Sequence, residues 1–183
     1  VAGLDPNDSS WRELIRAAGK VQRSDLAESI WKSALSYRYI MSKNNADEPR
    51  TRWTPSVESL AALLSVYLRQ ASKHNLDTNE KRQLSERVVT LYADVLYGHK
   101  AMGMDRIDLN QLLDSQRTMM LILQGIISLE GLHCCDDKRQ RELRTMATAI
   151  LQLNCFKGLE SQRLPWASYQ ALEKAKAWAE STY

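Results

Sequence analysis

The sequence predicts an all-α protein, built as a helical-hairpin array, or α-solenoid. Apolar residues recur at spacings of three and four along almost the whole chain, which is typical of amphipathic helices. The chain of 183 residues has only 7 glycines and 4 prolines, which disfavours an all-β architecture with its many tight turns. No apolar–polar alternation is long enough to indicate a strand. We therefore expect about seven helices, arranged as three pairs and a terminal helix.

The first two helices are expected to form an antiparallel hairpin, because only a few residues separate them. Asp8-Ser9-Ser10 supply good N-cap residues for the first helix. Its apolar side is formed by Trp11, Leu14, Ile15 and Ala18. Gly19 weakens that helix, and Ser24-Asp25 cap the second. The stripe of the second helix consists of Leu26, Ile30, Trp31, Ala34, Leu35, Ile40 and Met41.

A polar loop and a second helical pair follow. The loop runs from Ser42 to Thr54, and Pro55 begins the third helix, where its missing N–H is tolerated. The apolar face of the third helix is Leu60, Leu63, Leu64, Tyr67, Leu68 and Ala71, and His74-Asn75 end it. Thr78 or Asn79 caps the fourth helix. Its stripe is Leu84, Val88, Leu91, Tyr92, Val95 and Leu96.

Three more helices are expected after a break from Gly98 to Asp108. The fifth helix, capped by Asp108 and stopped by Gly131, has the stripe Leu109, Leu112, Leu113, Met119, Met120, Leu123, Ile126 and Ile127. The sixth starts at Asp136-Asp137, where negative charge favours a helix N-terminus. Its stripe is Leu143, Met146, Ala147, Ile150 and Leu151. Pro165 begins the seventh helix, with Trp166, Tyr169, Leu172, Ala175 and Trp178.

The length fits one helical-repeat domain over residues 1–183. An unpaired seventh helix would leave an apolar face uncovered, so we expect the domain to be a fragment of a longer chain. The content of 44% hydrophobic and 26% charged residues is typical of a globular protein. No run approaches the ~20 apolar residues of a membrane span. Cys134, Cys135 and Cys155 form no paired framework, which favours a reducing, intracellular compartment.

Sequence motifs give no indication of catalysis. A Gly-rich phosphate loop, an HExxH motif and a GxSxG elbow are all missing from the sequence. His133-Cys134-Cys135 combine metal-ligating types, but adjacent cysteines cannot easily both reach one tetrahedral ion. Asp47-Glu48 lie in a loop, and capping explains Asp136-Asp137. We expect no enzyme activity, no metal site and no cofactor. An enzyme whose site spans several helices is the least favoured alternative.

Basic residues gather in three places, with a net charge of +3 that permits nucleic-acid binding without demanding it. The groups are Arg12 and Arg16 on the first helix, Arg50 and Arg52 beside Trp53, and Lys138, Arg139, Arg141 and Arg144 at the start of the sixth helix. A basic strip with aromatic neighbours can hold a phosphate backbone while bases stack. The alternative interpretation is a solvated helix face, because Asp137 and Glu142 lie within the last group.

Residues 10–35 resemble a pentatricopeptide repeat. The match consists of Leu14-Ile15 in the first helix, and of Ala27 with Ile30-Trp31 in the second. Corresponding pieces are Leu63-Leu64, Leu121-Ile122 and Ser168–Leu172, at spacings longer than the family's repeat. Tetratricopeptide-like arrays, HEAT-like arrays and a non-repetitive bundle are the alternatives that the spacing leaves open.

The resemblance implies that the first helices line a concave surface and that a polar residue near each helix start reads a base of single-stranded RNA. The matching positions are Arg12, Ala61, Met119 and Gln170, of which Gln170 alone has the short amide that favours base reading. The implied function is RNA binding in organellar transcript stability, processing or translation, in the mitochondrial matrix.

A protein-interaction scaffold or assembly factor within a larger complex is the alternative function. Ala61 and Met119 cannot hydrogen-bond a base edge, so the same wall could face a protein instead. Trp53 is the expected surface anchor in that case, because tryptophan is enriched among binding hot spots. Single-stranded RNA and a protein are thus the two expected partners.

Overall fold

The structure, a computed structural model, describes residues 6–39, 51–132, 136–159 and 164–180. Its main helices are α1 (Asp8–Lys20), α2 (Ser24–Ser36), α3 (Val57–Ala71), α4 (Thr78–Leu96), α6 (Gln116–Gly131), α7 (Asp137–Leu151) and α8 (Trp166–Glu180). Shorter elements join them: β1 (Arg38–Tyr39), β2 (Thr51–Arg52), the 3-10 helices η1 (Ala101–Arg106) and η2 (Asn154–Phe156), and the single-turn α5 (Leu109–Asp114).

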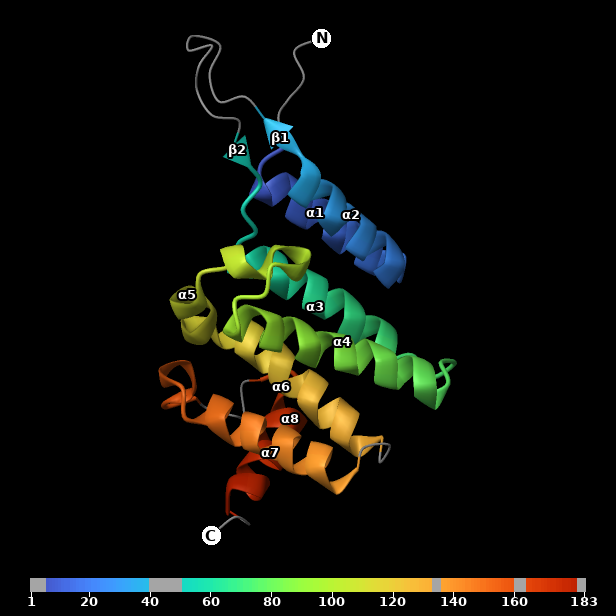
Figure 1. The fold of residues 1–183 in the computed structure, drawn as a ribbon. Coiled ribbons are helices and arrows are strands. Elements are labelled where there is room, and N and C mark those ends of the chain that lie inside the picture. The colour runs from blue at the N-terminus through green and yellow to red at the C-terminus, as the bar shows by residue number, and fades with distance from the viewer. Residues whose placement is uncertain (1–5, 40–50, 133–135, 160–163, 181–183) are drawn as a thin grey trace.

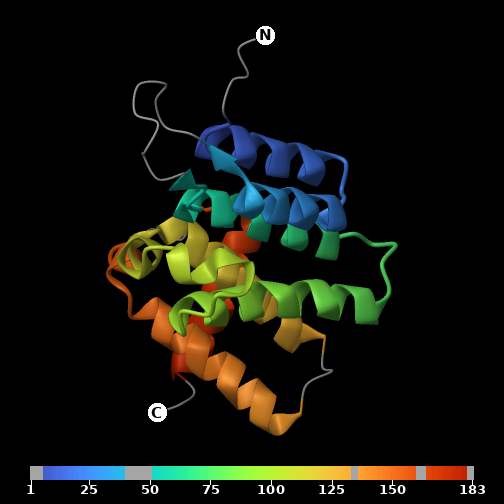
Figure 2. The ribbon, with the colours of Figure 1, turned by 45° about the horizontal axis from the view of Figure 1, so that its top comes forward.

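The helices form an α-solenoid, as the sequence predicted. The hairpins α1–α2, α3–α4 and α6–α7 follow one another along the stack, and α1 and α8 lie at opposite ends (Figure 1). The leading helices pack in succession, α1 on α3, α3 on α6 and α6 on α8. Figure 2 shows the same order after a turn of the molecule. Each hairpin thus buries its apolar faces against the next, which is how a solenoid builds a continuous core.

Polar caps explain where most helices begin. The Asn7 side chain accepts a 2.9 Å hydrogen bond from the Ser10 amide, so the cap of α1 lies one residue before the predicted group. Asp77 and Glu80 form a capping box at the start of α4. Asp108 and Asp136 cap α5 and α7, as predicted. Within the described residues, no helix has the length and apolarity needed to cross a bilayer.

The second and fifth expected helices differ most from the prediction. Smaller differences are that Ser56 caps α3, one residue after Pro55, and that Asp77 rather than Thr78 or Asn79 caps α4. The expected fifth helix breaks at Ser115, whose extended ψ of 91° makes it the C-cap of α5 and the N-cap of α6. The expected second helix ends at Ser36, and Arg38–Tyr39 then pair antiparallel with Thr51–Arg52. This short ladder joins the first hairpin to the segment that enters α3. Residues 40–50, which include the predicted helical positions 40 and 41, lie outside the described residues.

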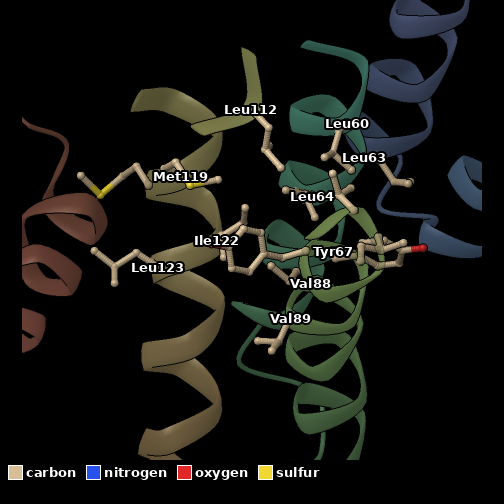
Figure 3. Close-up of a cluster of buried hydrophobic side chains, with 14 of the residues drawn as sticks. Leu60, Leu63, Leu64, Tyr67, Val88, Val89, Leu112, Met119, Ile122 and Leu123 are labelled. Atoms are coloured by element: carbon tan, nitrogen blue, oxygen red, sulfur yellow. The ribbon is translucent and has the colours of Figure 1, made fainter. Parts of the chain in front are cut away.

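The core lies where α3, α4 and α6 meet (Figure 3). Most of its labelled side chains come from the predicted stripes, namely Leu60, Leu63, Leu64, Tyr67, Val88, Leu112, Met119 and Leu123, whereas Val89 and Ile122 were not assigned to a stripe. Leu14 departs from the prediction, because its side chain is 48% exposed rather than buried.

Two glycines let helices approach closely. A Cβ on Gly19 would lie 2.7 Å from Val66, and one on Gly125 would lie 2.6 Å from Val88.

Candidate functional site

The positions that match the base-reading residues of the resemblance do not share an open wall. Ala61 is 1% exposed and Met119 is 0% exposed, so neither can contact a ligand. The expectation that these two residues line a binding surface is therefore wrong. The reason is that α3 and α6 are both central helices, and each packs against several other helices. The exposed side chains of these two helices are instead the polar residues Glu58, Arg69, Arg117 and Ser128.

Gln170 is exposed on α8 and borders a hollow of about 240 Å³ between the ends of α3, α6 and α8. Lys81 and Ser85 of α4 also line this hollow. The Ser85 hydroxyl has no hydrogen-bond partner within the described residues, yet its oxygen is fully buried.

The basic pair on α1 is neutralised within its own helix. Arg12 is partly buried, with Nη1 3.5 Å from the Asp8 carboxylate. Arg16 forms an ion pair with Glu13. The second basic pair falls largely outside the described residues, because Arg50 is not described and Arg52 is placed only as a residue of β2. The role of the second pair therefore stays a prediction.

Trp53, the expected surface anchor, is a core residue. Its ring is 5% exposed and packs edge-to-face against Trp31, with the ring centroids 5.1 Å apart. Its indole N–H donates a 3.1 Å hydrogen bond to Asp8. The prediction of an exposed tryptophan here is therefore wrong, because the segment before α3 folds back against α1 and α2.

Arg144 belongs to an ionic cluster around the buried carboxylate of Glu130 that joins three helices. Its guanidinium donates a 3.0 Å hydrogen bond to Glu130 of α6, and Lys174 of α8 donates a 2.9 Å bond to the other carboxylate oxygen. Both cations lie 5.6 Å from the ring centroid of Trp178. Burial alone would raise the pKa of Glu130, but the bonds from Lys174 and Arg144 lower it below its ordinary value. This cluster holds α6, α7 and α8 together.

Arg139 forms a second bridge between helices. Its guanidinium donates a 2.9 Å hydrogen bond to Glu86 of α4 and a 3.2 Å bond to Glu142 of α7. The two carboxylates therefore already neutralise this cation. Two of the four basic residues predicted on α7, Arg139 and Arg144, thus serve packing between helices.

Lys138 and Arg141 remain as exposed cations with no acidic partner within the described residues. Arg141 donates through Nε to the backbone oxygen of Asp137, at 3.2 Å. Both residues border a groove of about 720 Å³ between α4 and α7, which we name the α4–α7 groove. It is lined by Val89, Thr90, Ala93, Leu96, Tyr97, Lys138, Arg139, Arg141, Glu142, Thr145 and Met146.

The α4–α7 groove combines an apolar floor with a basic rim. Val89 is buried and Met146 is half-buried, whereas Leu96 is 37% exposed and Tyr97 is 75% exposed. Sequence reasoning assigned Leu96 to a buried stripe and did not single out Tyr97. The available signal was the position of Tyr97, which falls outside the spacing of three and four that defines the apolar stripe of the fourth helix.

The described residues contain no group of three or more histidine, cysteine or acidic side chains that could hold a metal ion. The sequence cluster His133-Cys134-Cys135 lies outside the described residues. Cys155 is half-buried beside α5 and donates through Sγ to the backbone oxygen of Leu113, at 3.2 Å. Burial raises the pKa of this thiol, which disfavours the reactive thiolate.

Comparison with known proteins identified no matching family model, no matching curated protein and no matching solved structure. The pentatricopeptide resemblance of residues 10–35 therefore stays a prediction. The α4–α7 groove combines exposed apolar side chains with cations that have no acidic partner within the described residues.

Proposed function

We propose that this chain is a helical-repeat scaffold that binds another protein through the α4–α7 groove. One observation carries the proposal. The groove joins exposed Leu96 and Tyr97 to two exposed cations, Lys138 and Arg141, that lack acidic partners within the described chain. Protein-binding sites typically combine an apolar, aromatic centre with a polar rim.

The partners of the other cations favour a protein over RNA. Arg12, Arg16, Arg139 and Arg144 each have a carboxylate partner, so a phosphate would have to displace an existing ion pair. Among the predicted cations whose side chains the structure describes, Lys138 and Arg141 lack a carboxylate partner, and they would supply about two phosphate contacts. For single strands, such a site predicts a slope of log affinity against log salt of only about −1.4. An apolar floor adds nothing to a phosphate backbone, whereas it stabilises an apolar protein surface.

Site-specific photo-crosslinking tests the proposal. A photoreactive amino acid replaces Thr90 in the α4–α7 groove, or replaces exposed Arg82, which lies elsewhere on α4, as the control. After irradiation in an extract, the sample is split in two. One half is treated with ribonuclease and the other half with protease. We expect an adduct at position 90, and none at position 82, that survives ribonuclease and is removed by protease.

The protein identified by this crosslink is then purified and titrated against matched variants. Leu96→Asp alters the groove, and Leu14→Asp introduces the same change at a comparably exposed leucine on α1. We expect at least about a tenfold loss of affinity for Leu96→Asp and little change for Leu14→Asp. An adduct that ribonuclease removes, or equal losses for both variants, would contradict the scaffold function.

A further inference from the structure

Resting on this scaffold function, we propose that the occupant of the α4–α7 groove is an acidic amphipathic helix. It would lie along α4 and α7, with its apolar face on the groove floor and its carboxylates toward α7. Three features of the groove lead to this partner: its length and spacing, the separation of its two walls, and the one-sided distribution of its charge.

The spacing of the lining residues fits a helix. On α4 the groove runs from Val89 to Tyr97, and on α7 from Lys138 to Met146. Both walls therefore extend over eight residue steps, or about 12 Å at 1.5 Å per residue, which is just over two helical turns. A helix of that length presents apolar side chains at positions i, i+3 or i+4, and i+7, which is the pattern of helix-in-groove recognition.

The two walls of the groove are not in close contact with each other. Helices α4 and α7 each pack on α6, but they do not pack closely on one another. Arg139 and Glu86 bridge the two walls at 2.9 Å through long side chains rather than through close backbone contact. A docked helix would contact both walls, in the way that a leading helix of the solenoid contacts its two neighbours.

The charge of the groove is confined to one wall. Lys138 and Arg141 are three residues apart on α7 and therefore share a face. The lining residues on the α4 wall are all uncharged, namely Val89, Thr90, Ala93, Leu96 and Tyr97. Glu142 does not cancel the basic wall, because it pairs with Arg139. A partner with acidic residues along one flank is thus favoured over a neutral or basic partner, and its orientation is fixed.

The experiment uses two designed helices, each about 15 residues long and stapled to hold the helical conformation. Both carry leucines at i, i+4 and i+7. The glutamate helix has glutamates along one flank, and the lysine helix has lysines at the same positions. Titration into the purified chain is followed by fluorescence anisotropy and by amide chemical shifts. We expect the glutamate helix to bind about tenfold more tightly or better, because it gains two ion pairs. The shifts should concentrate at Thr90, Tyr97 and Thr145.

Charge reversal provides the matched control. Lys138→Glu with Arg141→Glu should invert the preference between the two helices. Arg82→Glu with Lys157→Glu makes the same change in net charge at exposed residues outside the groove, and it should leave the preference unchanged. Circular dichroism confirms that both double variants keep their helical content.

Equal binding of the two helices, no binding of either, or a preference that survives the 138/141 reversal would overturn the acidic-helix proposal. Such a result, together with a protein adduct at position 90, leaves the scaffold function intact and shows that its partner has another chemistry. Conversely, an RNA adduct at position 90 would remove the scaffold function even where the glutamate helix binds selectively. The two failures are therefore distinguishable.

Discussion

The carboxylate of Asp8 accepts a 2.7 Å hydrogen bond from the hydroxyl of Ser59, which joins the first turn of α1 to the first turn of α3. The same carboxylate accepts a 2.7 Å bond from the Ser56 hydroxyl and a 3.1 Å bond from the Trp53 indole. Hydrogen bonds to an ionised acceptor are stronger than neutral ones. One acidic side chain thus fixes the start of the second hairpin against the first.

Asp8→Ala is expected to lower the free energy of unfolding by about 2 kcal/mol, because it leaves the Ser59 hydroxyl and the Trp53 indole without their acceptor. Urea unfolding followed by circular dichroism measures the loss. Asp105→Ala, at an exposed residue of η1, is the control and should change stability by less than about 0.5 kcal/mol. Equal effects of the two substitutions would show that the Asp8 contacts contribute nothing measurable.

A second junction joins α2, α3 and α4 through Glu28. Its carboxylate accepts a 2.7 Å hydrogen bond from the Tyr67 hydroxyl and a 3.2 Å bond from Arg87. Burial and the hydrogen bond to Glu28 raise the pKa of Tyr67 above its usual range. The unfolded chain therefore ionises this phenol first, so its contribution to stability is complete at neutral pH and declines as the pH rises above about 10.

Tyr67→Phe tests this linkage. At neutral pH the variant should be less stable by about 1.5 kcal/mol, because a charged acceptor loses one donor. The difference in unfolding free energy between wild type and variant should shrink as the pH rises from about 9 to about 11. Urea titrations at several pH values measure that difference. A difference that stays constant or grows would contradict the raised pKa.

Glu130→Gln tests the ionic cluster of α6, α7 and α8. Glu130 is 6% exposed, so removing its charge should cost about 2 kcal/mol at neutral pH. Because the pKa of Glu130 is lowered in the folded chain, its contribution is present above about pH 4.5 and is lost as the pH falls further. The stability gap between wild type and Glu130→Gln should therefore close in acid.

The control for this cluster is Glu173→Gln. Glu173 pairs with Lys176 on the surface of α8, at 2.9 Å, with both side chains more than 40% exposed. Loss of such a pair is expected to change stability by less than about 1 kcal/mol. A gap for Glu130→Gln that is no larger than this, or that widens in acid, would show that the cluster does not hold the three helices together.

Sequence periodicity predicted the helices well, because burial imposes the same spacing on every helix of a stacked array. Leu60, Leu63 and Leu64 of α3 were assigned inward from spacing alone, and all three are fully buried. Boundaries depended on tertiary context. From sequence alone, Ser115 could continue a helix or cap a new one. In the structure it ends α5 and caps α6, where its side chain accepts a hydrogen bond from the Thr118 amide. The ladder of β1 and β2 has two residues per strand, which is too short for any periodicity to show.

The candidate site was predictable only in part. Sequence showed that Lys138, Arg139, Arg141 and Arg144 gather at the start of one helix. It could not show that Arg139 faces Glu86, which is 53 residues away and on another helix. Helix spacing tells which side chains share a face, but not which helix lies opposite that face. The buried Ala61 illustrates the same limit, since α3 is enclosed on nearly all sides.

Gly125→Ala is expected to destabilise the protein, because the added Cβ would lie 2.6 Å from Cγ1 and 3.0 Å from Cβ of Val88. Neither α4 nor α6 can move away without disturbing the core between them, so we expect a loss of about 1–3 kcal/mol in urea unfolding. Gly131→Ala is the matched control in the same helix, where the nearest atom is Lys174 Nζ at 3.9 Å. Alanine favours helix there, so stability should stay unchanged or rise by up to about 1 kcal/mol. A Gly125→Ala variant as stable as Gly131→Ala would mean that α4 and α6 do not approach as closely as the structure shows.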